Sequence, residues 1–259
     1  MSGDRAGDPV GTALVTGAAR GIGAAVVRRF LARGYVVHAL DVLGGGALAS
    51  SHDLDAVVAL DPERVVPVQA DVRDLQAMHA AADDVVARHG SLDVVVAGAA
   101  VMAGGSPLWE TDPEELRLLW ETDALGMWNT AHATVPHLLV SGNAPSFVGV
   151  SSVAGRHGLW RLAAYCVAKH AAVGVVRGLA ADLKGTGVTA CCVAPGSTDT
   201  DMLRATAEVY GVDTASLAES HAAARPLDPD EVARVIEFGA TAGTVVHGTV
   251  LTADGGFSL

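Results

Sequence analysis

The stretch GTALVTGAARGIGAAVVRRFLARG, residues 11–34, decides the fold. Its first six residues are typical of a short buried strand, and the run AAVVRRFLARG after the glycines has helical spacing. Gly17, Gly21 and Gly23 lie in the turn between them, and Gly34 closes the helix. Such a turn is typical of an anion site, because bare backbone lets a pyrophosphate approach the helix dipole. A simple tight turn is the competing interpretation, and the strand and helix on either side disfavour it.

Apolar strands and helices continue to alternate along the chain. Further strands are predicted at 35–41, 64–70, 92–100, 146–152, 188–196 and 249–256, and helices at 52–60, 75–89, 113–140, from 162 onward and at 228–239. This alternation predicts an α/β fold, a single-domain Rossmann-type doubly wound parallel sheet of about seven strands with helices on both faces. Residues 1–9 are expected to be a mobile leader and 10–259 the domain, with a substrate lid near 197–226.

Composition excludes several classes of function. The formal net charge of −12 argues against a nucleic-acid partner or an anionic membrane surface. No apolar run reaches membrane-spanning length, and three cysteines do not form a disulfide framework, so a reduced, cytoplasmic protein is expected. The ten histidines show no metal-ligand spacing, so no metal site is predicted.

Tyr165 and Lys169 are the candidate catalytic pair. They lie four residues apart in an Ala- and Val-rich helical run, so they share one face of that helix. A lysine ammonium beside a tyrosine stabilises the phenolate and lowers the tyrosine pKa from about 10, which suits proton transfer to or from an alcohol. Ser152, at the end of the apolar run FVGVSS, can present its hydroxyl to the same oxygen. The pair alone is weak evidence, because chance matches are common in helices.

Asp41 predicts which dinucleotide is preferred. It ends the second predicted strand, 24 residues after Gly17. A carboxylate at that strand end accepts hydrogen bonds from an adenosine ribose and repels a 2′-phosphate, which favours NAD over NADP. Arg20 points mildly the other way, since an arginine in the phosphate loop can contact a 2′-phosphate. A solvated loop carboxylate is the alternative for Asp41.

These motifs together resemble the short-chain dehydrogenase/reductase family over about residues 10–256. The matching residues are TGAARGIG at 16–23, Asp41, Asp71-Val72, Ser152, Tyr165 with Lys169, Pro195-Gly196 with Thr200, and ADGG at 253–256. The resemblance implies NAD(P)-dependent interconversion of an alcohol and a carbonyl, with Tyr165 as acid–base, Ser152 on the substrate oxygen and Lys169 on the ribose. The cofactor-binding residues that it implies are Thr16, Gly17, Arg20, Gly21, Ile22, Gly23, Asp41, Asp71, Val72, Ala97, Gly98, Ala99, Tyr165, Lys169, Pro195, Gly196, Thr198 and Thr200.

Two departures from the family pattern stand out. The family's Asn-Asn-Ala-Gly after the fourth strand is here Ala97-Gly98-Ala99-Ala100. The family's catalytic asparagine is here Asp123, which is carried over as the fourth catalytic residue. In the family that asparagine acts through its main-chain carbonyl, at a local helix distortion. An aspartate is therefore expected to retain the geometry and to add a charge near Lys169.

A narrower resemblance points to the branch of the family associated with the redox cofactor mycofactocin. It is carried by LDVVVAGAAVMAGGSPLWET (92–111), by residues 161–190, by PGSTDTDML (195–203) and by the ADGGF ending. Members of that branch are thought to retain their nicotinamide cofactor beneath an insertion after the second strand. Here residues 48–60 resemble the end of that insertion, while its earlier part is reduced to the Gly44–Gly46 run.

The substrate-binding residues are predicted from loops that follow the strand ends. Met102, Leu159, Trp160 and Met202 are expected to line the substrate pocket, as is Trp109, although a core or interface role is an equal alternative for each. The leading prediction is a dehydrogenase for a mainly apolar secondary alcohol, with a homotetramer implied by resemblance. The alternatives are an ordinary enzyme with exchangeable NAD(P) and a non-catalytic dinucleotide sensor on the same fold.

Overall fold

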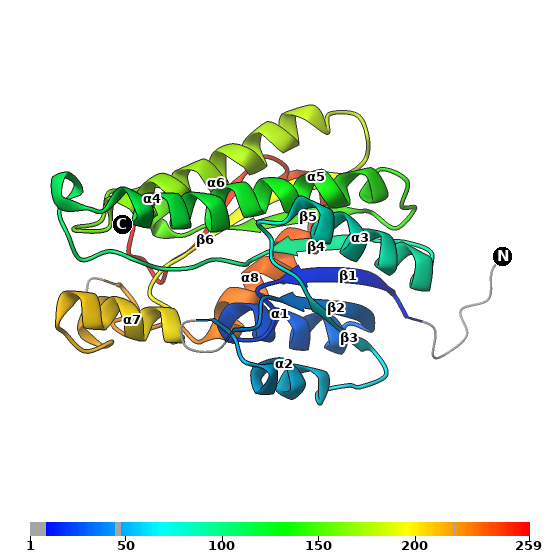
Figure 1. The fold of residues 1–259 in the computed structure, drawn as a ribbon. Coiled ribbons are helices and arrows are strands. Elements are labelled where there is room, and N and C mark those ends of the chain that lie inside the picture. The colour runs from blue at the N-terminus through cyan, green and yellow to red at the C-terminus, as the bar shows by residue number, and fades with distance from the viewer. Residues whose placement is uncertain (1–8, 45–47, 220) are drawn as a thin grey trace.

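Seven parallel strands form one sheet in the order β3-β2-β1-β4-β5-β6-β7 (Figure 1). In this computed structural model the described residues are 9–44, 48–219 and 221–259, so the expected leader up to residue 8 and part of the Gly44–Gly46 run lie outside them. The strands are β1 Gly11–Thr16, β2 Tyr35–Asp41, β3 Val65–Gln69, β4 Val94–Ala97, β5 Ser146–Val150, β6 Thr189–Pro195 and β7 Val250–Ala253. The predicted doubly wound parallel sheet is confirmed.

Helices cover both faces of the sheet, as Figure 1 shows. One face carries α1 Gly21–Ala32, α2 Ser51–Val58 and α8 Pro229–Thr241, whose buried side chains share one apolar cluster. The other face carries α3 Leu75–His89, α5 Gly126–Leu138 and α6 Ala163–Asp182, which share a second cluster. Strands buried on both faces read as continuous apolar runs, which is why the strands were recognisable in the sequence.

The site-bearing edge of the sheet is the one at which the strands end. Thr16 of β1 is in register with Ala97 of β4 on one side and with Leu40 of β2 on the other. Because the chain order reverses between β1 and β4, the turns after these strands diverge and leave a crevice, where ligands of open α/β sheets bind. Helix α7, Asp201–Tyr210, follows β6 and lies near this edge (Figure 1).

The predicted long helix over 113–140 is interrupted. It begins well, because Asp112 caps the Glu114 amide and Pro113 occupies the first turn of α4, Pro113–Leu119. A π-helical segment, Trp120–Leu125, then separates α4 from α5. Such bulges are frequent at functional sites, and this one contains Asp123, where the resemblance places a helix distortion.

The remaining elements are short. The 3-10 turns are Leu108–Glu110, Val153–Gly155, Ser216–Ala218 and Gly243–Val246. Among the described residues, no helix is both long and apolar enough to cross a membrane.

Candidate active site

The glycine turn after β1 is tightly packed. Gly17 has φ +70°, and a Cβ there would lie 2.8 Å from the Ala99 Cα. Gly23 admits no side chain, since its Cβ would lie 1.9 Å from the Gly17 carbonyl oxygen. The Thr16 hydroxyl accepts hydrogen bonds from the Gly98 and Ala99 amides at 3.1 and 3.2 Å, which ties β1 to the turn after β4. This tie joins neighbouring strands even though the family's asparagines are absent at 97 and 98.

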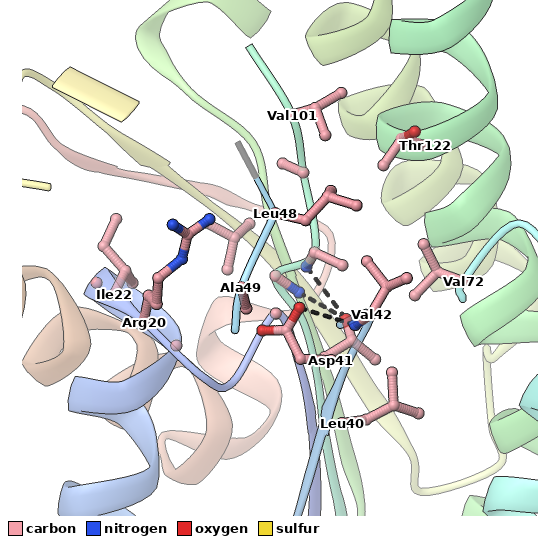
Figure 2. A pocket seen from close by; sticks show the side chains of 18 of the residues that line it. Arg20, Ile22, Leu40, Asp41, Val42, Leu48, Ala49, Val72, Val101 and Thr122 are labelled. Carbon is pink, nitrogen blue, oxygen red and sulfur yellow. Dashed lines mark hydrogen bonds between the residues drawn. The ribbon is translucent and has the colours of Figure 1, made fainter. Parts of the chain in front are cut away.

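A cavity of about 290 Å³ lies over this turn. Figure 2 shows Arg20 and Ile22 on one side of it, Val72 and Thr122 on the other, and Asp41, Leu48 and Ala49 between them. Of the residues predicted to bind the cofactor, those that line it are Thr16, Gly17, Arg20, Gly21, Ile22, Gly23, Asp41, Asp71, Val72, Gly98, Ala99 and Thr200. The cavity thus follows the predicted path of a dinucleotide, and bare glycine backbone makes room for a phosphate.

The Asp41 carboxylate faces the phosphate turn. It accepts hydrogen bonds from the Ala19 amide at 2.9 Å and from the Val42 amide at 2.9 Å. Burial raises the pKa of this carboxyl, and those two amides oppose the rise. A negative charge held by backbone amides in this position is able to accept ribose hydroxyls and to disfavour a phosphate.

Two further contacts border the cavity. Arg20 pairs with Asp201 at 3.2 Å, which connects the phosphate turn to the start of α7. Asp71 pairs with Arg73 at 2.6 Å, and this hydrogen-bonded pair lowers the pKa of Asp71. Each of these two contacts pairs one arginine with one aspartate at the edge of the cavity.

Tyr165 and Lys169 come together as predicted from their spacing, and Ser152 lines the same pocket as Tyr165. Tyr165 and Lys169 lie on one face of α6, 7% and 3% exposed, with the Lys169 Nζ 5.5 Å from the centre of the Tyr165 ring. Ser152 follows β5, where its hydroxyl accepts from the Ala154 amide at 3.1 Å. Burial raises the pKa of the Tyr165 hydroxyl, the Lys169 ammonium lowers it and the Asp123 carboxylate raises it further.

The charge that an aspartate at position 123 was expected to add near Lys169 forms a direct ion pair with that lysine. The Asp123 Oδ2 lies 3.1 Å from the Lys169 Nζ, and its Oδ1 accepts from the Val101 amide at 2.9 Å. Burial by itself would lower the pKa of Lys169, but the Asp123 carboxylate and Tyr165 raise it above its usual value. The resemblance assigned the role at this position to the main chain, so the ion pair made by the side chain adds to that role.

A second pocket of about 140 Å³ opens beside Tyr165. Met102, Leu159, Leu162 and Leu203 line it together with Ser152, and none of the described residues in its wall carries a charged side chain. Met202 lines the larger cavity, with its Sδ 3.8 Å from the Tyr165 hydroxyl. The predicted cofactor residues Pro195, Gly196 and Thr198 line this second pocket.

Some predicted residues lie apart from both cavities. Trp160 is 68% exposed, stacks under the Arg161 guanidinium and is not among the residues that line either cavity. Trp109 is 81% exposed. Ala97 and Lys169, which the resemblance assigns to cofactor binding, are each 3% exposed and are not among the residues that line the two cavities. The larger cavity is also lined by Leu48 and Ala49, which belong to the segment that resembles the end of the insertion. Other lining residues were not predicted to belong to the site, among them Leu40, Val42, Leu118 and Thr122. Leu40 and Val42 could have been predicted to line the cavity because they flank Asp41 in the sequence. Nothing in the sequence marks Leu118 or Thr122.

No group of three or more potential metal ligands occurs among the described residues. The three cysteines, Cys166, Cys191 and Cys192, are buried and free, as expected for core residues.

Comparison with known proteins places this site in a family. The profile of the short chain dehydrogenase family matches residues 11–210. Cis-4-hydroxycyclohexanecarboxylate dehydrogenase of Sinomonas cyclohexanicum is 33% identical over 247 residues, covering 95% of this chain and 96% of that protein. Meso-2,3-butanediol dehydrogenase of Serratia marcescens is 33% identical over 94% of this chain and 92% of its own length. The structure of carveol dehydrogenase from Mycobacterium avium in complex with NAD superposes with a TM-score of 0.90 at 28% identity, covering 96% of this chain and 98% of that one.

The matched range contains the glycine turn, Ser152, Tyr165 and Lys169. The chain therefore belongs to the short-chain dehydrogenase family, and the expectation that it is an enzyme of the dehydrogenase/reductase class is confirmed.

Proposed function

We propose that the chain interconverts a mainly apolar secondary alcohol and its ketone, with NAD as the redox cofactor. The observation that carries the proposal is the position of Tyr165. It lines a small apolar pocket on one side and has the buried Lys169 ammonium behind it, next to the cavity over the glycine turn. A proton-transfer group, a fixed cation and two adjoining cavities are what alcohol oxidation at a dinucleotide requires.

The residues around the larger cavity fit NAD. Gly17 and Gly23 leave backbone where any Cβ would collide, so the phosphates would lie on the start of α1. Asp41 would accept the adenosine ribose hydroxyls, and Asp71 and Val72 would border the adenine end. Lys169 would reach the other ribose, and residues 195–200 would follow the nicotinamide end. When bound, NAD supplies the acceptor for the hydride.

Tyr165 is the proton-transfer group. During oxidation its phenolate takes the hydroxyl proton of the alcohol while the carbinol hydrogen leaves as hydride, so the products are the ketone and a neutral phenol. During reduction the phenol returns that proton to the forming alkoxide. Ser152 donates a hydrogen bond to the same oxygen and holds it near Tyr165. Lys169 keeps positive charge beside the phenolate and so lowers its free energy.

The pocket beside Tyr165 suits a small, uncharged, apolar substrate. Met102, Leu159, Leu162 and Leu203 supply its apolar lining. The relatives named above support secondary alcohols on small carbon skeletons as substrates, namely a hydroxycyclohexane that also carries a carboxylate and a vicinal diol. Residues 197–226 would act as a lid, since Leu203 and Thr206 of α7 line this pocket.

Asp41→Ala is expected to narrow a preference for NAD over NADP by roughly tenfold or more. The Asp41 carboxylate is expected to repel a 2′-phosphate and so to weaken NADP binding by about 1.4 kcal/mol or more. About 1.4 kcal/mol corresponds to a tenfold change in affinity. Direct titration of both dinucleotides measures the ratio, with Asp41→Asn as a control that removes the charge and keeps the shape. Tighter NADP binding by the unmodified protein would show that Arg20 dominates.

We further propose that NAD is retained and is re-oxidised in place by mycofactocin as external electron acceptor. The segment after β2 supports this proposal. Leu43 and Ala49 form an isolated parallel bridge, Gly44 donates to the Ala49 carbonyl at 3.0 Å, and Leu48 and Ala49 line the cavity. With the Arg20–Asp201 pair on the other side, the cofactor would leave only when a cover opens.

Protein purified without added cofactor is therefore expected to release near-stoichiometric NAD or NADH on denaturation. Added apolar secondary alcohol should reduce this bound cofactor, seen as NADH absorbance, and should turn over with an artificial electron acceptor but not with free NAD. Steady NADH production from added NAD by cofactor-free protein would contradict retention and leave an ordinary exchangeable enzyme. Absence of alcohol conversion in either arm, across a panel of alicyclic and linear secondary alcohols, would contradict the proposed activity and favour a dinucleotide sensor.

We also propose a homotetramer and a cytoplasmic location. Trp120 and Trp128, 47% and 57% exposed in the π-helical segment and α5, are large apolar side chains suited to an interface between copies. Three free thiols are compatible with a reducing compartment. The oligomeric state is measured by light scattering.

A further inference from the structure

The Asp123 carboxylate is the feature of the site that the proposed reaction leaves without a task. It lies in the π-helical segment Trp120–Leu125, 1% exposed, on the inner side of the helical region. Its two oxygens have different partners: Oδ1 accepts from the Val101 amide at 2.9 Å, and Oδ2 lies 3.1 Å from the Lys169 Nζ. The carboxylate thus connects the loop after β4 to the lysine of α6.

This ion pair is fully enclosed. The side chains of Lys169 and Asp123 are 3% and 0% exposed, so water screens their attraction little. The Lys169 Nζ lies 5.5 Å from the centre of the Tyr165 ring, whereas it lies 3.1 Å from the carboxylate oxygen. The Lys169 ammonium is therefore in direct ionic contact with Asp123 while it also lies near the Tyr165 ring.

The other groups facing Tyr165 and Lys169 carry no net charge at neutral pH. Cys166, on α6, and Cys192, on β6, are thiols, and burial raises the pKa of Cys192 to about 12 and that of Cys166 above its usual value. Ser152, after β5, and Met202, on α7, do not ionise. The Arg177 guanidinium lowers the pKa of the Cys192 thiol and is not among the groups that shift the pKa of Tyr165 or Lys169. The charge that opposes Lys169 at Tyr165 is accordingly that of Asp123.

We propose that Asp123 is a positioning residue that holds the Lys169 ammonium in a buried ion pair and thereby sets the pH at which Tyr165 exchanges its proton with the substrate. The inference rests on the proposed role of Tyr165 and deepens it. Lys169 alone stabilises the phenolate, and the carboxylate beside it cancels part of that effect, so this chain needs a higher pH for the same phenolate fraction than the asparagine form would.

The sign of the expected change follows from this cancellation. In Asp123→Asn the amide has the same shape, and its oxygen still accepts from the Val101 amide. The Lys169 charge is then uncompensated, so the phenolate becomes more stable and the pKa of Tyr165 falls, by about one unit at the lower end of what a nearby charge does. Alcohol oxidation needs the phenolate, so its acid limb moves to lower pH. Ketone reduction needs the phenol, so its alkaline limb moves to lower pH by the same amount.

A titration without turnover tests this directly. The chain has three tyrosines, so protein labelled at the tyrosine Cζ carbon gives three NMR signals, and Tyr35→Phe and Tyr210→Phe assign two of them. The Tyr165 signal is followed against pH in the unmodified protein and in Asp123→Asn. A fall of about one unit is expected in the variant, and the pH profile of kcat/KM for alcohol oxidation should move by the same amount.

Asp93→Asn is the matched control. Asp93 is also 1% exposed, but it directly precedes β4, at the end of that strand away from the site. There it accepts hydrogen bonds from the Thr12 amide at 2.8 Å and from the Ser141 hydroxyl. Its loss is expected to lower the melting temperature without moving the Tyr165 titration, which separates charge from general destabilisation.

The proposal would be overturned if the pKa of Tyr165 in folded Asp123→Asn were unchanged. It would also be overturned if that pKa rose, because Lys169 would then have lost its proton in the variant. This outcome is distinct from failure of the proposed function, in which the Tyr165 titration would move as expected but loss of the Tyr165 hydroxyl would leave turnover intact.

Discussion

Tyr165→Phe is expected to lower kcat for alcohol oxidation by about 10²–10⁴-fold, because general acid–base catalysis typically contributes that much. The substitution removes one hydroxyl from a side chain that is 7% exposed and leaves its ring packing in place. The hydroxyl is not a main anchor of the cofactor, so the dinucleotide Kd should change little. The measurement is kcat from initial rates at saturating alcohol, together with a dinucleotide titration.

Tyr35→Phe serves as the control for this substitution. Tyr35 begins β2, at the opposite end of the strand from Asp41, and its ring packs against Phe30. Loss of its hydroxyl should leave kcat within a few-fold of the unmodified protein. If Tyr165→Phe behaved in the same way, Tyr165 would not be the proton-transfer group.

The parts of the site that could be predicted are those fixed by local sequence. Glycine spacing after an apolar strand located the phosphate turn, and the structure places Gly17 and Gly23 where a Cβ would collide with backbone. A spacing of four residues located Tyr165 and Lys169 on one face of α6. The position at a strand end located Asp41 beside the cavity. Each of these follows from a short-range rule of strand or helix geometry.

The parts that could not be predicted depend on packing between distant segments. The resemblance predicted a charge at Asp123 near Lys169, but no short-range pattern gives a contact between residues 46 apart. The structure supplies it, with the Asp123 carboxylate in the π-helical segment 3.1 Å from the Lys169 Nζ. A pattern of 3.6 residues predicts a continuous helix and has no signal for one extra residue in a turn. Leu118 of α4 and Thr122 of the π-helical segment also line the cavity, and no short-range sequence pattern marks them.

Trp160 was predicted to lie either at the substrate pocket or at an interface. Its place after a strand and before α6 suggested the substrate pocket, but the side chain is 68% exposed under Arg161, and its carbonyl accepts from the Tyr210 hydroxyl at 2.6 Å. Sequence position located the loop and not the direction of the side chain.

Gly23→Ala is expected to abolish useful dinucleotide binding. Its Cβ would lie 1.9 Å from the Gly17 carbonyl oxygen and 2.7 Å from the Gly17 carbonyl carbon, so backbone, and not a flexible side chain, would have to move. A displaced Gly17 also loses its fit against Ala99, where a Cβ would already lie 2.8 Å from the Ala99 Cα. Overpacking typically costs 1–3 kcal/mol, occasionally more, and about 3 kcal/mol corresponds to roughly 100-fold in Kd.

Gly178→Ala provides the matched glycine control. Gly178 is exposed within α6, and a Cβ there would meet nothing within 4 Å. Alanine is the better helix former by roughly 0.8–1.0 kcal/mol, so this variant should melt slightly higher and bind NAD as before. Calorimetric titration and melting curves of both variants provide the comparison. If the Kd of Gly23→Ala for NAD were within a few-fold of that of the unmodified protein, the phosphate turn would accommodate a methyl group. The close-packed turn would then not be the site of the pyrophosphate.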